Sequence, residues 1–471
     1  MNPKMFGHKA VRVIAVTAVL GLSVSVGAGT AFADHPPAIN PGLLPSDGTP
    51  HPLDQTEQPA NTPCVSTTPG GDGPAIPVAQ RVLGLDQAWH FSTGAGVLVA
   101  VIDTGVAHHP RLPGLMSGGD YVSSSDGTQD CDGHGTAVAG IIAASQVPGQ
   151  GFAGVAPDAR IVSIRQLSEY FQPKGTTMEN SPTAMPQGYG STTTMADAIV
   201  HAANMGARVI NLSEVSCRPT LTDGDVGAAV QYAAIQKDVV IVAAAGNNDV
   251  CKGTNPVLDP TDPTADPWTK VNMDVTPAWY DHYVLSVGSI DPTTGAPSKF
   301  TVPGPWVGVA APGEDITSLD VNYNEPGSKG TAVGFVKKGG QQIPIAGTSF
   351  ASPYVAGLAA LIRARYPQLG ALDVIKRIEA TAHAPAEGWN PYIGYGSIDP
   401  VAALTDQVPN RLPPKQPFAA KSWQLPIPAT PPAPDNTARN VALIGSAVIV
   451  VLLILGYLAS FPIRRRLGMR D

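Results

Sequence analysis

The 471-residue chain has few charged residues, and positive charge is the scarcer sign. Charged side chains make up 14% of the sequence, with 29 Lys and Arg against 37 Asp and Glu, so the formal net charge is −8. Nucleic-acid binding relies on clustered positive charge, so this balance argues against a nucleic-acid partner. Apolar residues make up 43% of the chain. The composition therefore favours a large globular unit with room for further segments.

Cysteine is also scarce, and its spacing resembles no zinc site. The sequence predicts no metal and no cofactor.

Residues 1–33 carry a positive start, an apolar run over 13–26 and a small-x-small site at 31–33, which is typical of a secretory signal peptide cleaved after Ala33. An uncleaved anchor is the alternative, but the run is short. An even number of cysteines in an exported chain favours two disulfides with three possible connectivities among Cys64, Cys131, Cys217 and Cys251.

Glycine and proline are abundant, with 50 and 47 residues, which predicts long loops and at least one irregular segment. Residues 34–77 show neither helical nor strand periodicity. We interpret them as an N-terminal extension that lies along the next domain and is held by Cys64; a flexible spacer is the alternative. Residues 406–440 are Pro-rich and predict a semi-rigid linker.

An apolar, uncharged run over 441–461 follows the linker. As a helix it would span about 32 Å, which matches a bilayer core of about 30 Å. Three arginines then begin the tail 462–471. Positive charge stays on the cytoplasmic side, so the sequence predicts a single-pass protein of the cell membrane with a cytoplasmic C-terminus and an extracytoplasmic main domain.

Residues 78–405 alternate between strand and helix patterns. The continuous apolar run over 97–102 is typical of a strand buried on both faces of a parallel sheet. Strands are also predicted over 159–164, 208–212, 239–243 and 284–287, and helices over 134–144, 195–207, 225–237 and 348–365. The pattern predicts an α/β fold with a doubly wound, mostly parallel sheet flanked by helices. Three insertions, 166–191, 250–281 and 318–344, are interpreted as surface loops.

Three short motifs follow one another in this domain. Residues 101–105 read Val-Ile-Asp-Thr-Gly, residues 132–136 Asp-Gly-His-Gly-Thr, and residues 347–353 Gly-Thr-Ser-Phe-Ala-Ser-Pro. They supply an acid, a base and a nucleophile in Asp103, His134 and Ser349. In amide hydrolysis Ser349 would attack the carbonyl carbon, His134 would accept its proton, and Asp103 would orient the ring. Any one motif alone would be weak, since an Asp after a strand is usually a loop cap.

Other residues bear on the same chemistry. His108 and His109 lie near Asp103, but neither stands in a Gly-x-Gly helix entry, so both are interpreted as structural. Asn247 directly follows the strand over 239–243 and could point an amide donor at a developing oxyanion. We expect Pro353 to be tolerated in the first helical turn, where its missing N–H would have no intrahelical partner.

The order Asp, His, Ser and the three motifs resemble the subtilases over roughly residues 78–405. Within them, the order of signal, extension, protease, linker and membrane helix is similar to the mycosins, the membrane-anchored proteases of mycobacterial type VII secretion systems. The resemblance implies a subtilisin-like fold, Asp103, His134 and Ser349 as the triad, and Asn247 in the oxyanion hole. It also implies protein substrates and association with a secretion membrane complex. Two usual subtilase features are not found in this sequence: a folded prosegment and a loop with enough carboxylates for calcium.

One departure from the family concerns the wall of the substrate cleft. Many subtilases carry Ser-Leu-Gly-Gly there, whereas residues 211–217 read Asn-Leu-Ser-Glu-Val-Ser-Cys. We expect Ser213, Glu214 and Val215 to contact substrate in a different way. Cys217 follows this wall and Cys251 follows the oxyanion residue, so a Cys217–Cys251 bridge would brace the cleft. A Cys64–Cys131 bridge would hold the extension near His134.

Two functions fit these observations. The first is an active, selective endopeptidase outside the membrane that processes secreted substrates. The second is mainly a structural subunit of the secretion complex, with catalysis secondary. A scavenging protease is less favoured, because a tether restricts access to substrates.

Overall fold

The computed structural model describes residues 35–46, 48–175, 184–186, 188–256, 266–336, 340–408, 412, 415 and 435–467. The predicted signal peptide, most of the predicted linker and the end of the basic tail lie outside these residues. The chain divides into two units, 1–419 and 420–471, and each is described by itself.

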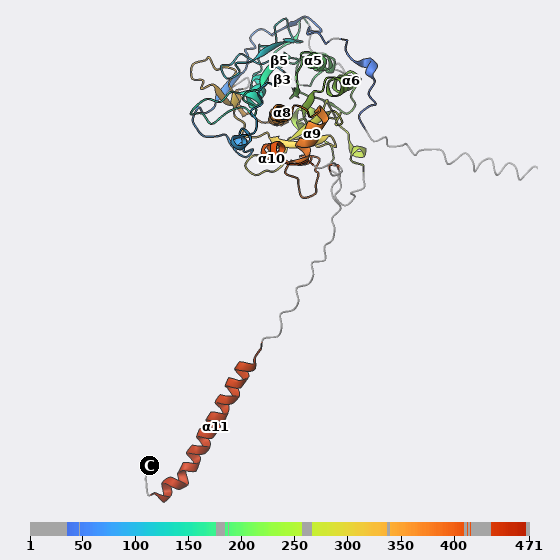
Figure 1. The fold of residues 1–471 in the computed structure, drawn as a ribbon. Helices are drawn as coiled ribbons and strands as arrows, with labels where there is room; N and C mark the ends of the chain where they lie inside the picture. Colours follow the sequence, from blue (N-terminus) through green and yellow to red (C-terminus); the bar gives the residue numbers. More distant parts are fainter. Residues whose placement is uncertain are drawn as a thin grey trace, which may run out of the picture. The chain divides into compact units, whose positions relative to one another are not determined.

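The first unit is built on a seven-stranded sheet in the order β12-β11-β9-β7-β3-β5-β4, in which all neighbouring strands are parallel. Helices cover both faces, as the alternation predicted (Figure 1). The sheet strands are β3 (Leu98–Asp103), β4 (Met116–Asp120), β5 (Arg160–Arg165), β7 (Val209–Leu212), β9 (Val240–Ala244), β11 (Val284–Ile290) and β12 (Val307–Pro312). The doubly wound α/β fold expected from the sequence is confirmed.

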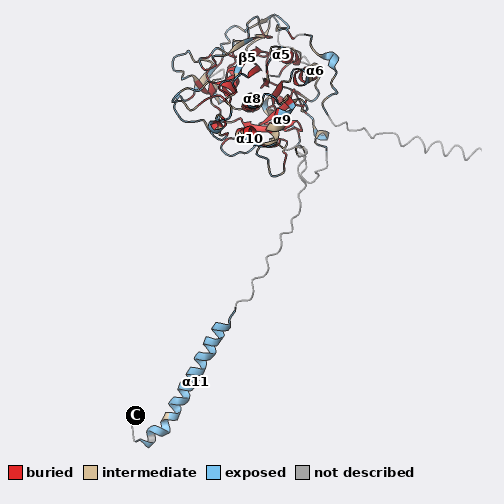
Figure 2. Ribbon diagram, in the orientation of Figure 1, coloured by how far each residue is buried: buried red, intermediate tan, exposed pale blue. Residues whose placement is uncertain are grey.

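Strand periodicity divides the core into two layers. In β3, Val99 and Val101 face one side of the sheet, whereas Ala100 and Ile102 face the other. The first side packs against α4 (His134–Ala143), α8 (Thr348–Arg365) and α9 (Ala371–Ala380), and the second against α5 (Thr192–Asn204) and α6 (Gly224–Gln231). Buried residues fill the sheet and α8 in Figure 2. Because both faces are covered, the strands read as continuous apolar runs.

Shorter helices complete the unit: α2 (Val78–Arg81), α3 (Leu85–Ala88), α7 (Asn248–Cys251) and α10 (Pro400–Thr405), with 3-10 turns η1 (Pro41–Leu43) and η3 (Pro267–Lys270). The helix predicted over 225–237 is α6 followed by a π-helical turn, η2 (Tyr232–Gln236).

The segments interpreted as irregular contain strands. The third insertion forms β13 (Ser318–Leu319), β14 (Thr331–Val336) and β15 (Gln342–Pro344), and the extension adds β2 (Ser66–Pro69) to β14 in an antiparallel pair. The extension also forms β1 (Thr56–Glu57), which pairs with β6 (Gln172–Pro173) of the first insertion. In the second insertion β10 (Asp274–Thr276) pairs with β8 (Ser216–Arg218). The pairs β1–β6, β2–β14 and β8–β10 join distant parts of the chain, whereas β13, β14 and β15 pair within one insertion. Most of these strands have only two to four residues, which is too short for a clear periodicity.

In the second unit, the described residues 435–467 form helix α11 (Thr437–Arg466). Among the described residues it is the helix that is long and apolar enough to cross a membrane, with 28 residues from Thr437 to Arg464, a mean hydropathy of 2.8 and none of its apolar window buried. Figure 2 shows it exposed along its length. The apolar run predicted over 441–461 lies within it.

Candidate active site

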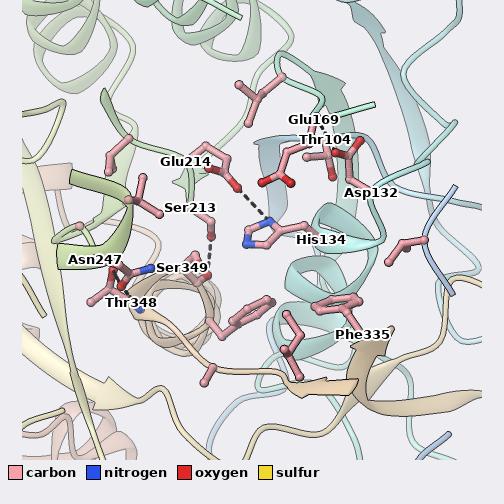
Figure 3. Close-up of a pocket in the computed structure, with 18 of the residues that line it drawn as sticks. Thr104, Asp132, His134, Glu169, Ser213, Glu214, Asn247, Phe335, Thr348 and Ser349 are labelled. Atoms are coloured by element: carbon pink, nitrogen blue, oxygen red, sulfur yellow. Dashed lines mark hydrogen bonds and ion pairs between the residues drawn. The ribbon is translucent and has the colours of Figure 1, made fainter. Parts of the chain in front are cut away.

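The predicted functional residues come from four elements that meet at one edge of the large sheet. Asp103 is the last residue of β3, His134 the first of α4, and Ser349 the second of α8, while Asn247 follows β9. Parallel strands end at the same edge, where sites of doubly wound sheets form. His134, Asn247 and Ser349 line one cleft of about 230 Å³ (Figure 3).

Asp103 orients the imidazole ring of His134. The side chain of Asp103 is fully buried, and its Oδ1 lies 2.8 Å from Nδ1 of His134. Oδ1 also accepts the backbone N–H of Thr104 at 2.8 Å. A proton on Nδ1 leaves Nε2 free to accept another. A Cβ at Gly135 would lie 2.0 Å from the carbonyl oxygen of Gly105. The glycine after the histidine therefore lets the start of α4 lie close against the segment that follows Asp103.

Asp130 supports the start of α4 and was missed by the sequence reasoning. It is half-buried and accepts the backbone N–H groups of Gly133 and Thr136, each at 2.8 Å, as well as the hydroxyls of Thr136 and Thr104. Burial raises the pKa of its carboxyl, and the threonine hydrogen bonds oppose that shift. In the sequence, Asp130 stands four residues before His134 and close to a predicted helix start, where an acid often caps the helix. This position is the signal that could have identified Asp130.

Ser349 is held by a hydroxyl from the cleft wall. Helix α8 begins at Thr348, so Pro353 stands beyond the first turn, and the interpretation of its position was wrong. Without an N–H on Pro353, the carbonyl of Ser349 lacks its helical donor. Ser213 fills this gap, since its Oγ donates to the Ser349 carbonyl at 2.7 Å.

Asn247 presents its amide nitrogen to the cleft. Its Oδ1 accepts the backbone N–H of Thr348 at 3.0 Å and the Thr348 hydroxyl at 2.9 Å. These two donors identify the oxygen end of the amide, so Nδ2 is the end that faces Ser349. A Cβ at Gly347 would lie 2.9 Å from Ser349 Oγ and 3.2 Å from Asn247 Nδ2. Glycine therefore keeps open the space between nucleophile and donor.

The cleft has an acidic wall and an apolar wall. Asp132, Glu169 and Glu214 line one side, and Val65, Phe335 and Ile343 are among the apolar residues of the cleft. Val215, also expected at the substrate wall, lines the cleft and is buried. Burial and the charge of Asp130 raise the pKa of Asp132 to about 7, although Ser168 Oγ and the backbone N–H of Glu169 donate to it.

Glu214 lines the cleft and also lies beside the ring of His134. Its Oε1 is 3.4 Å from Nδ1 of His134, and its side chain is 11% exposed. Figure 3 shows the carboxyl directed at the ring. Burial lowers the pKa of His134, but the charges of Asp103 and Glu214 outweigh it and raise that pKa. Burial raises the pKa of Glu214, and the charge of His134 opposes this.

Donor atoms of Asp103, His134 and Glu214 lie within 4.8 Å of one another, the spacing of a metal-ligand set. Here Nδ1 of His134 already shares a short hydrogen bond with Asp103. A metal on Nδ1 would displace that proton, so we interpret the group as an acid–base set.

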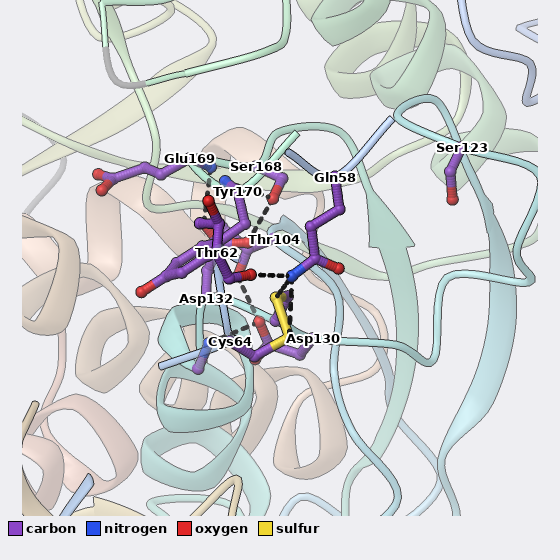
Figure 4. The surroundings of a disulfide bond; sticks show 12 residues. Gln58, Thr62, Cys64, Thr104, Ser123, Asp130, Asp132, Ser168, Glu169 and Tyr170 are labelled. Atoms are coloured by element: carbon purple, nitrogen blue, oxygen red, sulfur yellow. Dashed lines mark hydrogen bonds between the residues drawn. A yellow bond between two sulfur atoms is a disulfide. The ribbon is translucent and has the colours of Figure 1, made fainter. Parts of the chain in front are cut away.

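Two disulfides frame the cleft, with the pairing expected from the sequence. Cys217 bonds to Cys251, and Cys64 bonds to Cys131. Beside the second bridge, Val65 donates its N–H to the Cys131 carbonyl at 2.9 Å. Figure 4 places Cys64 next to Asp130 and Asp132, just before His134. The extension is thereby fixed beside the active site.

His109, considered as an alternative base, is buried away from the cleft. Its ring packs edge-on against Tyr323 at 4.7 Å between centroids, and its Nδ1 accepts the backbone N–H of Arg111. Burial lowers its pKa to about 4. A neutral, enclosed ring agrees with a structural role.

A buried Asp at a strand end that is hydrogen-bonded to a His at a helix start, with a serine at another helix N-terminus in the same cleft, defines a serine protease of the subtilisin-like class. Residues 94–396 match the model of the Subtilase family. Mycosin-3 of Mycobacterium tuberculosis is 43% identical over 90% of this chain and 91% of its own. The chain belongs to the subtilase family and, within it, to the mycosins.

Solved structures agree with this placement. The serine protease MycP1, an essential component of the type VII (ESX-1) secretion system, is 46% identical, with a TM-score of 0.72 over 79% of this chain and 99% of that one. A chain of an intact ESX-5 inner membrane complex is 40% identical, with a TM-score of 0.72 over 90% of this chain and 99% of that one.

Proposed function

We propose that this chain is a membrane-anchored, extracytoplasmic serine endopeptidase in which Asp103, His134 and Ser349 form the triad. The hydrogen bond from His134 to buried Asp103, with Ser349 in the same cleft, carries the proposal. Ser349 Oγ attacks the scissile carbonyl as His134 takes its proton. His134 then returns the proton to the leaving amine, and water repeats the sequence to release the acyl group.

Asn247 is proposed as the oxyanion donor. Its oxygen is held by Thr348, so Nδ2 can donate to the carbonyl oxygen as negative charge develops there. The backbone N–H of Ser349, at the start of α8, supplies a second donor. Ser213, Glu214 and Val215 form the proposed substrate wall of the cleft. Ser213 also holds Ser349 in place through its hydrogen bond to the Ser349 carbonyl.

The proposed organisation follows the sequence: signal peptide 1–33, extension 34–77, catalytic domain 78–405, linker 406–440, membrane helix 441–461 and cytoplasmic tail 462–471. The length and hydropathy of α11 support the anchor. The chain is similar to MycP1 and to a chain of an ESX-5 inner membrane complex. This similarity supports the proposal that it cleaves secreted proteins next to the membrane complex of a type VII secretion system.

A test compares wild type with Ser349→Ala as full chains in detergent, using a fluorophosphonate label and a candidate secreted substrate. We expect labelling and cleavage by wild type, and loss of labelling with turnover lowered by a factor on the order of 10⁶ in the variant. Ser66→Ala, an exposed serine of β2, is the control and should behave as wild type. A folded wild type that neither labels nor cleaves would contradict the proposal.

A mainly structural subunit is the second candidate, favoured by the similar chain within an assembled membrane complex. Secretion in cells separates the two. If deletion of the chain stops secretion but Ser349→Ala does not, then its presence in the complex, rather than proteolysis, is what secretion requires.

A further inference from the structure

Nδ1 of His134 has two carboxylates beside it. Asp103 Oδ1 is at 2.8 Å and Glu214 Oε1 at 3.4 Å. A neutral imidazole carries one Nδ1 proton, which the shorter contact directs to Asp103. Orientation of the ring therefore does not require Glu214, and a second acid at this atom calls for a different explanation.

The surroundings hold Glu214 in this position. Its neighbour Ser213 is bonded to the main chain of Ser349, and Val215 on the other side is buried. The short segment between them leaves the Glu214 carboxyl enclosed, with an 11% exposed side chain directed at the ring (Figure 3). Water screens such a contact weakly, so its charge acts strongly on the imidazole.

Resting on the proposed function, we propose that Glu214 is a positioning residue that acts through His134, as a second carboxylate that stabilises the protonated ring and so sets the lower pH limit of activity. The two forms of His134 have opposite needs. The attack of Ser349 requires a neutral ring to accept a proton, whereas the transition state contains the imidazolium. Glu214 opposes the first requirement and assists the second.

The other groups around this pair are also acids. Asp130 and Asp132 precede α4, Glu169 follows β5, and Asp103 ends β3; the charges of Asp103, Glu169 and Asp132 raise the pKa of Glu214 after burial, and Asp130 raises that of His134. Burial raises the pKa of Asp132 to about 7, so Asp132 also changes charge within the pH range of the test described next. Among these acids of the described site, Asp103 and Glu214 are the two whose carboxylates contact the His134 ring.

The test measures kcat/KM from pH 5 to 9 for full-length wild type and Glu214→Gln in detergent, on one quenched peptide. Removal of an opposite charge at this distance should move the acid limb of the profile down by about 1 pH unit. The variant is then about tenfold faster than wild type on the acid limb and slower on the alkaline plateau, so the two profiles cross. Glu325→Gln, an exposed acid that is not among the residues lining the cleft, is the matched control and should keep the wild-type limb.

A second readout does not depend on turnover. Histidines labelled with ¹³C in the ring report the pKa of His134 by NMR titration, and Glu214→Gln should lower it by about 1 unit. Glu214→Asp withdraws the carboxyl from the ring by one methylene and should lower the pKa of His134 by less. This variant replaces Glu214→Gln in the titration if the glutamine variant does not fold.

Three results would overturn the inference: a uniform change of rate at every pH, an unmoved His134 titration, or an acid limb that moves with Asp132→Asn instead. A wild type without cleavage or labelling contradicts the proposed function instead, and the NMR titration still decides the role of Glu214.

Discussion

Functional side chains of the cleft are held in place by polar groups from neighbouring functional segments. Thr348, beside Ser349, fixes the amide of Asn247 through two hydrogen bonds. Ser213, on the substrate wall, bonds to the carbonyl of Ser349. Such preorganisation lets donors stabilise developing charge without rearrangement during the reaction.

At the residue scale, Asn247→Ala removes the proposed oxyanion donor. We expect kcat to fall by about 10²–10³ with KM little changed, because the donor acts in the transition state. Steady-state kinetics on one peptide measure both. Asn248→Ala is the control, since that side chain donates to the Lys299 carbonyl on the exposed surface. Equal losses in both variants, or a loss confined to KM, would contradict the role.

At the element scale, the extension is part of the protease through both a strand and a disulfide. Strand β2 pairs with β14, and Val65, just before β2, lines the cleft with Phe335 of β14. The bridge from Cys64 to Cys131 spans 67 residues. The extension thus contributes a wall of the substrate cleft.

Replacing both Cys64 and Cys131 with Ser should lower the free energy of unfolding by about 4 kcal/mol, because the unfolded chain regains the entropy of a long loop. Turnover should also fall, since Val65 loses its anchor. Urea unfolding under non-reducing conditions measures the first effect, and peptide kinetics at a permissive temperature the second. Ser66→Ala, which keeps both the Cys64–Cys131 and the Cys217–Cys251 bridges, is the control and should unfold like wild type. An unchanged unfolding midpoint would mean that β2–β14 pairing alone holds the extension.

At the scale of the whole molecule, the proposed active site and the proposed membrane helix lie in different units. The cleft lies within residues 1–419, and the apolar helix α11 within 420–471. A chain that ends at residue 436 should therefore appear in the soluble fraction and keep its peptide turnover. Removal of only 468–471 leaves α11 complete and should leave the protein with membranes. Membrane retention of the shorter chain would show that other surfaces attach it.

Much of the fold and the core of the site follow from local sequence. The apolar run of β3 and the periodicity of α5 depend on burial of nearby faces, so the sheet and its helices were predictable. Motif spacing placed Asp103, His134 and Ser349 at strand and helix ends, and these meet because parallel strands share an edge. The strands of residues 318–344 were not predictable, because two of them have only two or three residues and the segment is completed by β2 of the distant extension.

What the sequence determined by itself is the chemistry available: an acid, a base, a nucleophile, an amide donor and an apolar segment long enough for a bilayer. The tertiary structure decided how these groups act on one another. Ser213 reaches Ser349 across 136 residues, and Glu214, which lines the cleft, also contacts the ring of His134. Such contacts depend on how distant segments pack and on which charges burial leaves side by side, and neither quantity is encoded in residue type or spacing.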